Sequence, residues 1–278
     1  MTLGRVVIIS VVAGLLGVIN PALAVEQRVT GFTRVVEDLA LGLPVAGRIQ
    51  HLRVKEGDRI ARGRVILSLD KRLEDLEYKR RVVIRDDRTL LDAARQKVEI
   101  LRRQLTATRT LYENSRSVSR DELDAKELEL ASATAERQRL ELAEKTERLE
   151  ADLARVQLDQ RVLRAPTAGR IVKIHKRQGE SVQTHEPVVQ LVTITPCLFV
   201  ANIEEALSEN IQMGMKVVLH LKTGSRTVQT EGTISFISPV LDTASGLLEV
   251  HATFDNRKPE IRPGVMGEML IEVSEPEL

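Results

Sequence analysis

The chain has 278 residues, of which 42% are hydrophobic, 29% charged and 2% aromatic, and its formal net charge is +1. This composition excludes an intrinsically disordered chain and an integral membrane protein, and the near-neutral charge gives no reason to expect a polyanionic partner. Aromatic side chains are scarce and Trp is absent, which argues against the stacking platforms that bind single-stranded nucleic acids.

The N-terminus has the features of a secretory signal peptide. A basic residue precedes an apolar run over residues 6–19, which as a helix would be about 21 Å long, shorter than a bilayer core of about 30 Å. A helix-breaking Pro21 follows, and then Ala22 and Ala24 supply the small residues that a signal peptidase requires. We predict a signal peptide over residues 1–24, cleaved after Ala24. The alternative is an uncleaved N-terminal anchor.

Two short segments with the same pattern begin at Gly47 and Gly169. Each continues with Arg-Ile and alternating apolar and polar residues, and each has a second glycine at the equivalent position, Gly57 or Gly179. Such runs, separated by glycine turns, predict short strands joined by tight turns. Neither half has enough apolar side chains to fold alone. We therefore expect the two halves to pack on each other as two small sheets of one β-sandwich.

The segment between the two halves is predicted to be a long antiparallel helical hairpin. No Gly or Pro occurs from Arg64 to Ala165, and residues that favour helices make up most of this segment. Apolar or small residues recur at intervals of seven, which predicts a coiled coil with both stripes in its seam. The stripe slips between Asp86 and Leu90, which we interpret as a stutter. The two predicted stripes are Leu91, Val98, Leu105 and Tyr112, with Ala94 and Leu101 beside them, and Leu128, Ala135, Leu142, Leu149, Val156 and Leu163.

The hairpin is predicted to turn within the serine-rich residues 114–119. Ser119 is followed three residues later by Glu122, which is the spacing of a capping box, so a second helix should begin directly after Ser119. Each helix would contain roughly 40–45 residues and extend about 60–65 Å. The arm would therefore leave one turn of the sandwich and return to it, which explains why the sandwich is split.

The C-terminal part of the chain is predicted to be a small antiparallel β-barrel that includes one short helix, residues 204–211. Its strands are alternating or β-branched runs separated by Gly and Pro. The five runs lie within residues 197–203, 216–221, 227–237, 247–254 and 267–273. The whole chain is thus expected to be mainly β with one long helical hairpin. The predicted division is 1–24 signal peptide, 25–70 N-terminal strand and first half of the sandwich, 71–163 hairpin, 164–195 second half, and 196–274 barrel.

This order of segments resembles that of the periplasmic adaptor subunits of bacterial tripartite transporters. These are the membrane fusion proteins of the resistance-nodulation-division and haemolysin-secretion groups. The resemblance is carried by PVAGRIQHLRVKEGDRIARGRVILSLD at residues 44–70 and LRAPTAGRIVKIHKRQGESV at residues 163–182. In the barrel, GTISFISPVLDTASGLLEVHATFDN is followed by RPGVMGEM. The resemblance implies a lipoyl-like sandwich, no enzymatic activity and no cofactor. Many members continue into a membrane-proximal domain, which the resemblance does not reach here.

The resemblance also implies a function and a set of contact residues. Such adaptors stand in the periplasm as rings of several copies and bridge an inner-membrane transporter, here first of all one of the resistance-nodulation-division class, to an outer-membrane channel. The family's hairpin tip docks on the channel through an Arg, a Leu and a Ser at fixed spacing. Ser119 matches the Ser, whereas the Leu position falls on Tyr112 and the Arg position on Thr108, with Arg109 and Leu111 one residue away. We expect Arg109, Leu111, Tyr112 and Ser119 to form the docking tip.

Other functions are possible for a chain of this kind. The adaptor could serve an ABC-type or type I secretion system, or the chain could be a periplasmic coiled-coil scaffold without a transporter.

Lys71 lies where lipoyl domains present a modified lysine, but here it should begin the long helix. The methionine pairs Met213/Met215 and Met266/Met269 could be soft metal ligands, although packing in the barrel core explains them equally well. We predict no metal site, and a buried Cys197, the only cysteine.

Overall fold

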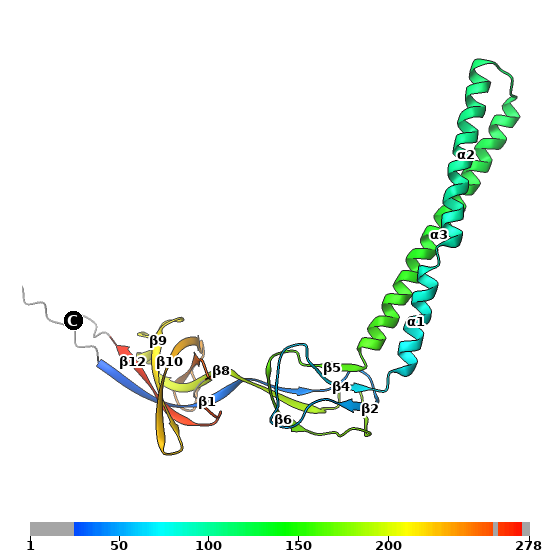
Figure 1. The fold of residues 1–278 in the computed structure, drawn as a ribbon. Helices are drawn as coiled ribbons and strands as arrows, with labels where there is room; N and C mark the ends of the chain where they lie inside the picture. The colour runs from blue at the N-terminus through cyan, green and yellow to red at the C-terminus, as the bar shows by residue number, and fades with distance from the viewer. Residues whose placement is uncertain (1–24, 258–260, 274–278) are drawn as a thin grey trace, which may run out of the picture. The chain divides into compact units, whose positions relative to one another are not determined.

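The computed structural model describes residues 25–257 and 261–273 (Figure 1). The predicted signal peptide lies outside the described residues. The chain divides into two compact units, one made of the described residues up to Val36 and from Ile194 onward, the other of Glu37–Thr193. Strands β1 (Val25–Leu41) and β8 (Val189–Glu204) contribute to both units. Within the described ranges, no helix combines the length and apolarity needed to cross a membrane.

The first unit is a β-barrel. After β8 and the short helix α4 (Glu205–Ser208), its strands are β9 (Lys216–Thr223), β10 (Arg226–Ile237), β11 (Leu247–Phe254) and β12 (Met266–Val273). The hydrogen-bonded order is β1-β12-β9-β10-β11-β8, and an additional β1–β8 pairing closes the barrel. The five predicted C-terminal strands and the short helix are confirmed. The N-terminal strand β1 adds a sixth strand by pairing antiparallel with β12.

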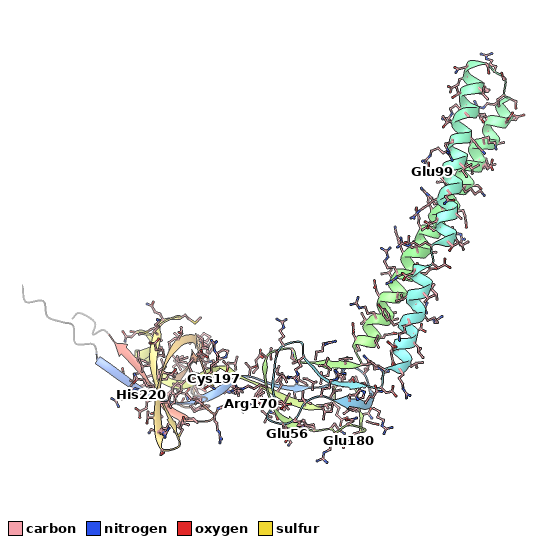
Figure 2. The ribbon with its side chains drawn as sticks, in the orientation of Figure 1. Glu56, Glu99, Arg170, Glu180, Cys197 and His220 are labelled. Atoms are coloured by element: carbon pink, nitrogen blue, oxygen red, sulfur yellow. The ribbon has the colours of Figure 1, made fainter. Side chains whose placement is uncertain are left out.

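Alternation along the barrel strands directs one set of side chains into a shared core. Phe199, Leu219, Val250 and Phe254 are buried there, as expected for strands with one face in contact with the core. Cys197 also lies in this core (Figure 2), and its Sγ is 3.1 Å from the carbonyl oxygen of Arg34. Burial raises the pKa of the Cys197 thiol to about 11. This cysteine is therefore a packing residue with a protonated, unreactive thiol.

Asn256 fastens the loop between β11 and β12 from inside the barrel unit. Its buried side-chain amide donates hydrogen bonds to the carbonyl oxygens of Ile194 (3.0 Å) and Ile261 (2.8 Å). Its Oδ1 accepts a hydrogen bond from the backbone N–H of Ile261 at 2.7 Å. Three backbone groups are thus satisfied by one side chain, which is why a buried polar residue is tolerated at this position.

The second unit contains the β-sandwich and the helices. The sandwich strands are β2 (Gly47–Leu52), β3 (Arg59–Ile60), β4 (Val65–Leu69), β5 (Val162–Arg164), β6 (Gly169–Ile174) and β7 (Ser181–Val182). One sheet has the order β5-β4-β2-β7, and β3 pairs with β6, which in turn pairs with β8. The expectation that each half would form its own sheet is wrong. The halves exchange strands, because the two-residue strands β3 and β7 each find their backbone partners in the opposite half.

This exchange is reciprocal at the level of single hydrogen bonds. Gly57 N donates to Ile171 O at 2.8 Å, and Gly179 N donates to Ile49 O at 2.9 Å. The two bonds are related by the offset that separates Gly47 from Gly169 in the sequence. Gly57 and Gly179 have φ angles of +90° and +93°, a left-handed conformation that glycine adopts without strain. The repeated glycines therefore occupy equivalent turns of a pseudo-symmetric sandwich.

The same symmetry extends to the side chains that brace these turns. Asp58 Oδ2 accepts a hydrogen bond from Lys55 N at 2.9 Å, and Glu180 Oε2 (Figure 2) accepts one from Arg177 N at 3.2 Å. Each carboxylate closes a turn just before β3 or β7, in the manner of short polar side chains that bond to nearby backbone. At Gly169, by contrast, the reason for glycine is close approach, since a Cβ there would lie 2.5 Å from Val192 O.

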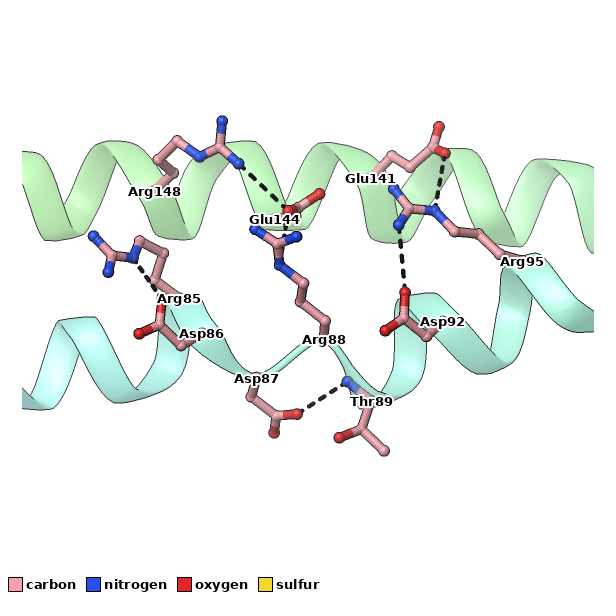
Figure 3. A network of polar contacts seen from close by, with 10 residues as sticks. All are labelled: Arg85, Asp86, Asp87, Arg88, Thr89, Asp92, Arg95, Glu141, Glu144 and Arg148. Carbon is pink, nitrogen blue, oxygen red and sulfur yellow. Dashed lines mark hydrogen bonds and ion pairs between the residues drawn. The ribbon is translucent and has the colours of Figure 1, made fainter.

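Three helices form the arm between β4 and β5. They are α1 (Arg72–Asp86), α2 (Thr89–Asn114) and α3 (Arg120–Asp159), and α3 runs back alongside the other two (Figure 1). The outgoing side of the arm is thus two helices, not the single helix with a stutter that we expected. The chain is non-helical at Asp87 and Arg88, and Asp87 Oδ1 accepts a hydrogen bond from Thr89 N at 3.1 Å, which starts α2 (Figure 3).

The predicted stripe of the outgoing side is confirmed, and that of α3 is wrong. Leu91, Val98 and Leu101 are buried against α3, but Leu142 and Leu149 on α3 are exposed. The face of α3 that packs against α1 and α2 is a mixture of small, apolar and charged residues: Leu123, Leu130, Ala133, Leu140, Ala151 and Ala154, with Glu127, Glu141, Glu144 and Glu150 beside them. Alanines allow close approach, and the glutamates are paired by arginines of the outgoing side of the arm, so the most apolar heptad of α3 is left outside.

Candidate functional site

The end of the arm is the turn over residues 115–119, between α2 and α3 (Figure 1). Ser115 Oγ donates a hydrogen bond to Leu111 O at 2.9 Å, and Ser117 Oγ donates to Ser115 Oγ at 2.8 Å. Arg116 has a φ angle of +49°, in the left-handed region that commonly ends helices. The turn is therefore ordered by its own short side chains and presents a small polar surface.

Ser119 begins the returning helix. Its Oγ accepts a hydrogen bond from Glu122 N at 3.1 Å, and its backbone is extended, as in a standard N-cap. The helix start predicted from the Ser-x-x-Glu spacing is confirmed. Asp121 and Glu122 lie in the first turn, where the helix dipole favours negative charge. The Ser119 hydroxyl thus has a structural task already, and any partner would meet a capped and acidic helix start.

Two polar contacts link α2 to α3 just behind the turn. Arg109 Nη2 lies 2.6 Å from Glu127 Oε1. The pKa of Arg120 is raised, first by the carboxylate of Asp124, 2.9 Å from its Nε, and then by a hydrogen bond with Tyr112. These contacts join the ends of the two helices just behind the turn.

The structure brings the four predicted tip residues to the last turns of the arm, but their surroundings differ. Leu111 is 50% exposed, and Ser119 is exposed while its hydroxyl caps α3. Tyr112 is half-buried and Arg109 is engaged by Glu127. Sequence reasoning missed Glu127, because its contact crosses between helices and depends on their register. Leu111 is the large apolar side chain of this set that is available to a partner.

The methionine pairs do not form joint sites. Met213 is exposed whereas Met215 packs against the barrel core, and Met266 is exposed whereas Met269 is fully buried. Neither pair directs both sulfur atoms to one surface, so packing accounts for the buried members. In the described part of the chain, no group of three or more His, Cys, Asp or Glu residues could hold a metal ion. Lys71 lies at the N-cap of α1, as expected of a residue that begins the arm.

Comparison with curated proteins finds relatives among export proteins. The chain is 23% identical over 241 residues to the macrolide export protein MacA of Shigella flexneri, with 83% of this chain and 62% of that protein covered. It is 24% identical over 224 residues to the cation efflux system protein CzcB of Alcaligenes sp., with 80% of this chain and 40% of that protein covered. The chain thus spans about three fifths of the first relative and two fifths of the second.

Solved structures show the same fold. The crystal structure of MacA from Actinobacillus actinomycetemcomitans matches with a TM-score of 0.63 and 16% identity, over 90% of this chain and 79% of that one. The membrane fusion protein Spr0693 from Streptococcus pneumoniae matches with a TM-score of 0.53 and 14% identity, over 90% of this chain and 100% of that one.

Two family models cover most of the described residues. The model described as "RND MFP, barrel-sandwich hybrid domain" matches residues 39–195, and the model described as "CusB-like, beta-barrel domain" matches residues 199–275. The first match alone includes the split sandwich, the whole arm and more than half of the chain. The sandwich whose halves exchange strands is the barrel-sandwich hybrid, and the chain belongs to the RND membrane fusion protein (MFP) family.

Proposed function

We propose that the chain is the periplasmic adaptor of a tripartite efflux pump, which links an inner-membrane transporter to an outer-membrane channel. Membership of the membrane fusion protein family and the similarity to proteins named for macrolide export and cation efflux support this role. A transporter of the resistance-nodulation-division class is the first candidate, and an ABC-type or type I secretion system is the alternative. The role is architectural, and it needs no catalytic residue or cofactor.

The observation that carries the proposal is the arm with its ordered end. Helix α3 has 40 residues, so the arm reaches about 60 Å from the sandwich. Its two sides are joined along their length by ion pairs, including Arg95 Nε to Glu141 Oε1 at 3.8 Å and Arg109 to Glu127. We infer that the arm acts as an antiparallel helical hairpin that carries the turn at residues 115–119 to the channel.

We propose further that several copies form a ring around the exported solute. Rings arise when a head-to-tail contact between different surfaces of identical chains closes on itself. Export by the predicted signal peptide would place the copies in the periplasm. In such a ring the arms stand side by side, and their ends meet the channel together.

The proposal is tested in a strain that lacks the gene but retains its transporter and channel. Deletion should raise sensitivity to at least one solute in a panel of antibiotics, detergents, dyes and metal salts, and the wild-type gene should restore resistance. A photo-crosslinking residue at Leu111 should capture the channel protein. The same residue at Ile100, also about half exposed and on the same helix, should not. Unchanged sensitivity, or equal capture from both positions, would contradict the proposed role.

A further inference from the structure

The outer face of α3 carries an apolar stripe that no other described residue of the chain covers. Its members lie seven residues apart, or fourteen between the first two, and each lies two residues, or about 200° of helical rotation, from residues on the packed face such as Leu130, Ala151 and Ala154. Soluble proteins rarely leave a contiguous apolar patch exposed unless it binds something. The exposed fractions are 72% for Leu128, 65% for Leu142, 69% for Leu149 and 52% for Val156.

The opposite outer face of the arm, on α1, is apolar as well. Leu76 and Val83 are 65% and 72% exposed. Arg81 turns toward α3, where it pairs with Glu150, and Val83 lies about 200° further around the helix. The two sides of the base of the arm therefore carry apolar residues with the same seven-residue interval.

The two faces are matched in height. The pair of Arg81 with Glu150 fixes the register of α1 against α3, and because the helices are antiparallel, each step up α1 is a step back along α3. Val83 then lies about one residue from the level of Leu149, and Leu76 lies about one residue from the level of Val156. A ring with simple rotational symmetry keeps every residue at its own height, so each apolar residue would meet an apolar residue of the next copy.

The charges beside these residues are complementary too. On α1, exposed Lys79 and Arg80 lie between Leu76 and Val83 and pair within the helix with Asp75 and Glu77; at the same height on α3 lies exposed Asp152. Higher up, the signs are reversed on both sides. Asp86, which pairs with the adjacent Arg85, follows Val83 on α1, and exposed Lys145 precedes Leu149 on α3. Two faces whose apolar residues and opposite charges agree at several heights have the pattern that specifies partners and register in coiled coils.

We propose that the outer face of α1 in one copy binds the outer face of α3 in the next copy, with Val83 against Leu149 and Leu76 against Val156. This inference rests on the proposed function, and it specifies which surfaces make the ring. The contact is heterologous, so each copy uses both faces once, and the series forms a ring when the rotation between copies closes. Beyond the non-helical residues Asp87 and Arg88 the seven-residue interval no longer marks the same face, because Lys97 lies next to the buried Val98. The proposed contact is therefore defined for the base of the arm, where α1 lies beside α3.

Cysteine pairs test both the faces and the register. The chain carrying Val83→Cys and Leu149→Cys should form a ladder of disulfide-linked multimers when cells producing it at native level are oxidised. The two faces of one copy point apart, and a disulfide needs Cβ atoms about 3.5–4.5 Å apart, so only contact between copies can form it. The native Cys197 is buried and contributes no background. Either cysteine alone should leave the chain monomeric on a non-reducing gel.

The matched control combines Val83→Cys with Leu128→Cys. Leu128 belongs to the same stripe and is as exposed as Val83, but it lies 21 residues from Leu149, about 31 Å along the helix. This pair should give no ladder. A monomeric Val83/Leu149 double variant, an equal ladder from the control, or dimers from Leu149→Cys alone would each overturn the proposed contact.

A second measurement uses the heterologous nature of the contact. Leu149→Glu should disable the α3 face and Val83→Glu the α1 face, and neither change should unfold the arm because both positions are exposed. Each purified full-length variant should stay monomeric in native mass spectrometry, whereas an equimolar mixture should stop at dimers with one copy of each. Larger assemblies from either variant alone would refute the contact. Solute resistance is scored separately in the deletion strain: a ladder without any resistance phenotype refutes only the efflux role, and resistance without a ladder refutes only the contact.

Discussion

Changes at Ser119 can separate the structural task of this residue from a task at the channel. Its Oγ accepts the Glu122 N–H at 3.1 Å, and loss of such a cap costs about 1 kcal/mol. Ser119→Ala should therefore raise the population of the frayed first turn of α3 about fivefold. Aspartate caps as well as serine and interacts favourably with the helix dipole. Ser119→Asp should keep the first turn intact while it adds one negative charge to the end of the arm.

Hydrogen exchange and transport measurements together show whether Ser119 only caps α3 or also contacts the channel. Amide exchange at Glu122 and Leu123, whose N–H groups bond to Ser119 Oγ and Ser119 O, should be at least about fivefold faster in Ser119→Ala than in the wild type and unchanged in Ser119→Asp. If the tip contacts the channel at Ser119, resistance in the deletion strain should be lost with the aspartate and only weakened with the alanine. This combination is not expected of a residue that only caps a helix, because then the alanine variant should be the more defective.

Ser117 provides the control for charge alone. Its hydroxyl bonds only to Ser115 Oγ among the described contacts, so Ser117→Asp adds the same charge two residues away without removing the cap. Resistance should be largely kept in this variant. Full resistance with Ser119→Asp would show that Ser119 has no part in docking, and equal loss with Ser117→Asp would show that any charge on the turn has the same effect.

Three further changes test the packing described above. Leu142→Asp should leave helicity and melting temperature unchanged because Leu142 is exposed, whereas Leu101→Asp should destabilise the arm by about 3 kcal/mol; equal melting curves would refute the assigned packed face. Cys197 should react with a maleimide only after denaturation, because burial raises its thiol pKa to about 11, and reaction in the native protein would contradict its placement. Asn256→Ala should lower the free energy of unfolding of the barrel unit by about 2–4 kcal/mol in denaturant titrations. A loss below about 1 kcal/mol would show that the three backbone groups find other hydrogen-bond partners in the variant.

Local patterns in the sequence predicted much of the fold. The barrel strands follow from runs of alternating apolar and polar residues that Gly and Pro separate. The start of α3 follows from Ser119 and Glu122, whose interaction is confined to four residues. The exchange of β3 and β7 between the halves could not be predicted in this way. It depends on hydrogen bonds such as Gly179 N to Ile49 O, which join residues far apart in the chain.

The error on α3 has a definite physical cause. Choosing the most apolar heptad assumes that burial of large side chains decides how helices pack, and Leu142 and Leu149 satisfy that criterion best. The structure buries Ala151 and Ala154 and satisfies the adjacent glutamates with arginines, as in the pair of Arg81 with Glu150. Such pairs depend on the register of one helix against another, and the sequence of a single helix does not determine that register. For the same reason, the contact of Arg109 with Glu127 behind the tip was not predicted.

The pairing of β4 with β5 at the base of the arm has a consequence for the order in which the chain folds. Ser68 is opposite Val162, and Leu69 N donates a hydrogen bond to Arg161 O at 2.9 Å. Bringing these ends together across an unstructured segment of about 90 residues costs about 4 kcal/mol of chain entropy, whereas closing only the short turn of a hairpin costs about 1.4 kcal/mol. Helical segments form within microseconds, long before sheets with distant partners. If the helices of the arm pair from the far end toward the base, they bring the two halves of the sandwich close together. The slow pairing of the sandwich strands then begins from ends that are already near each other.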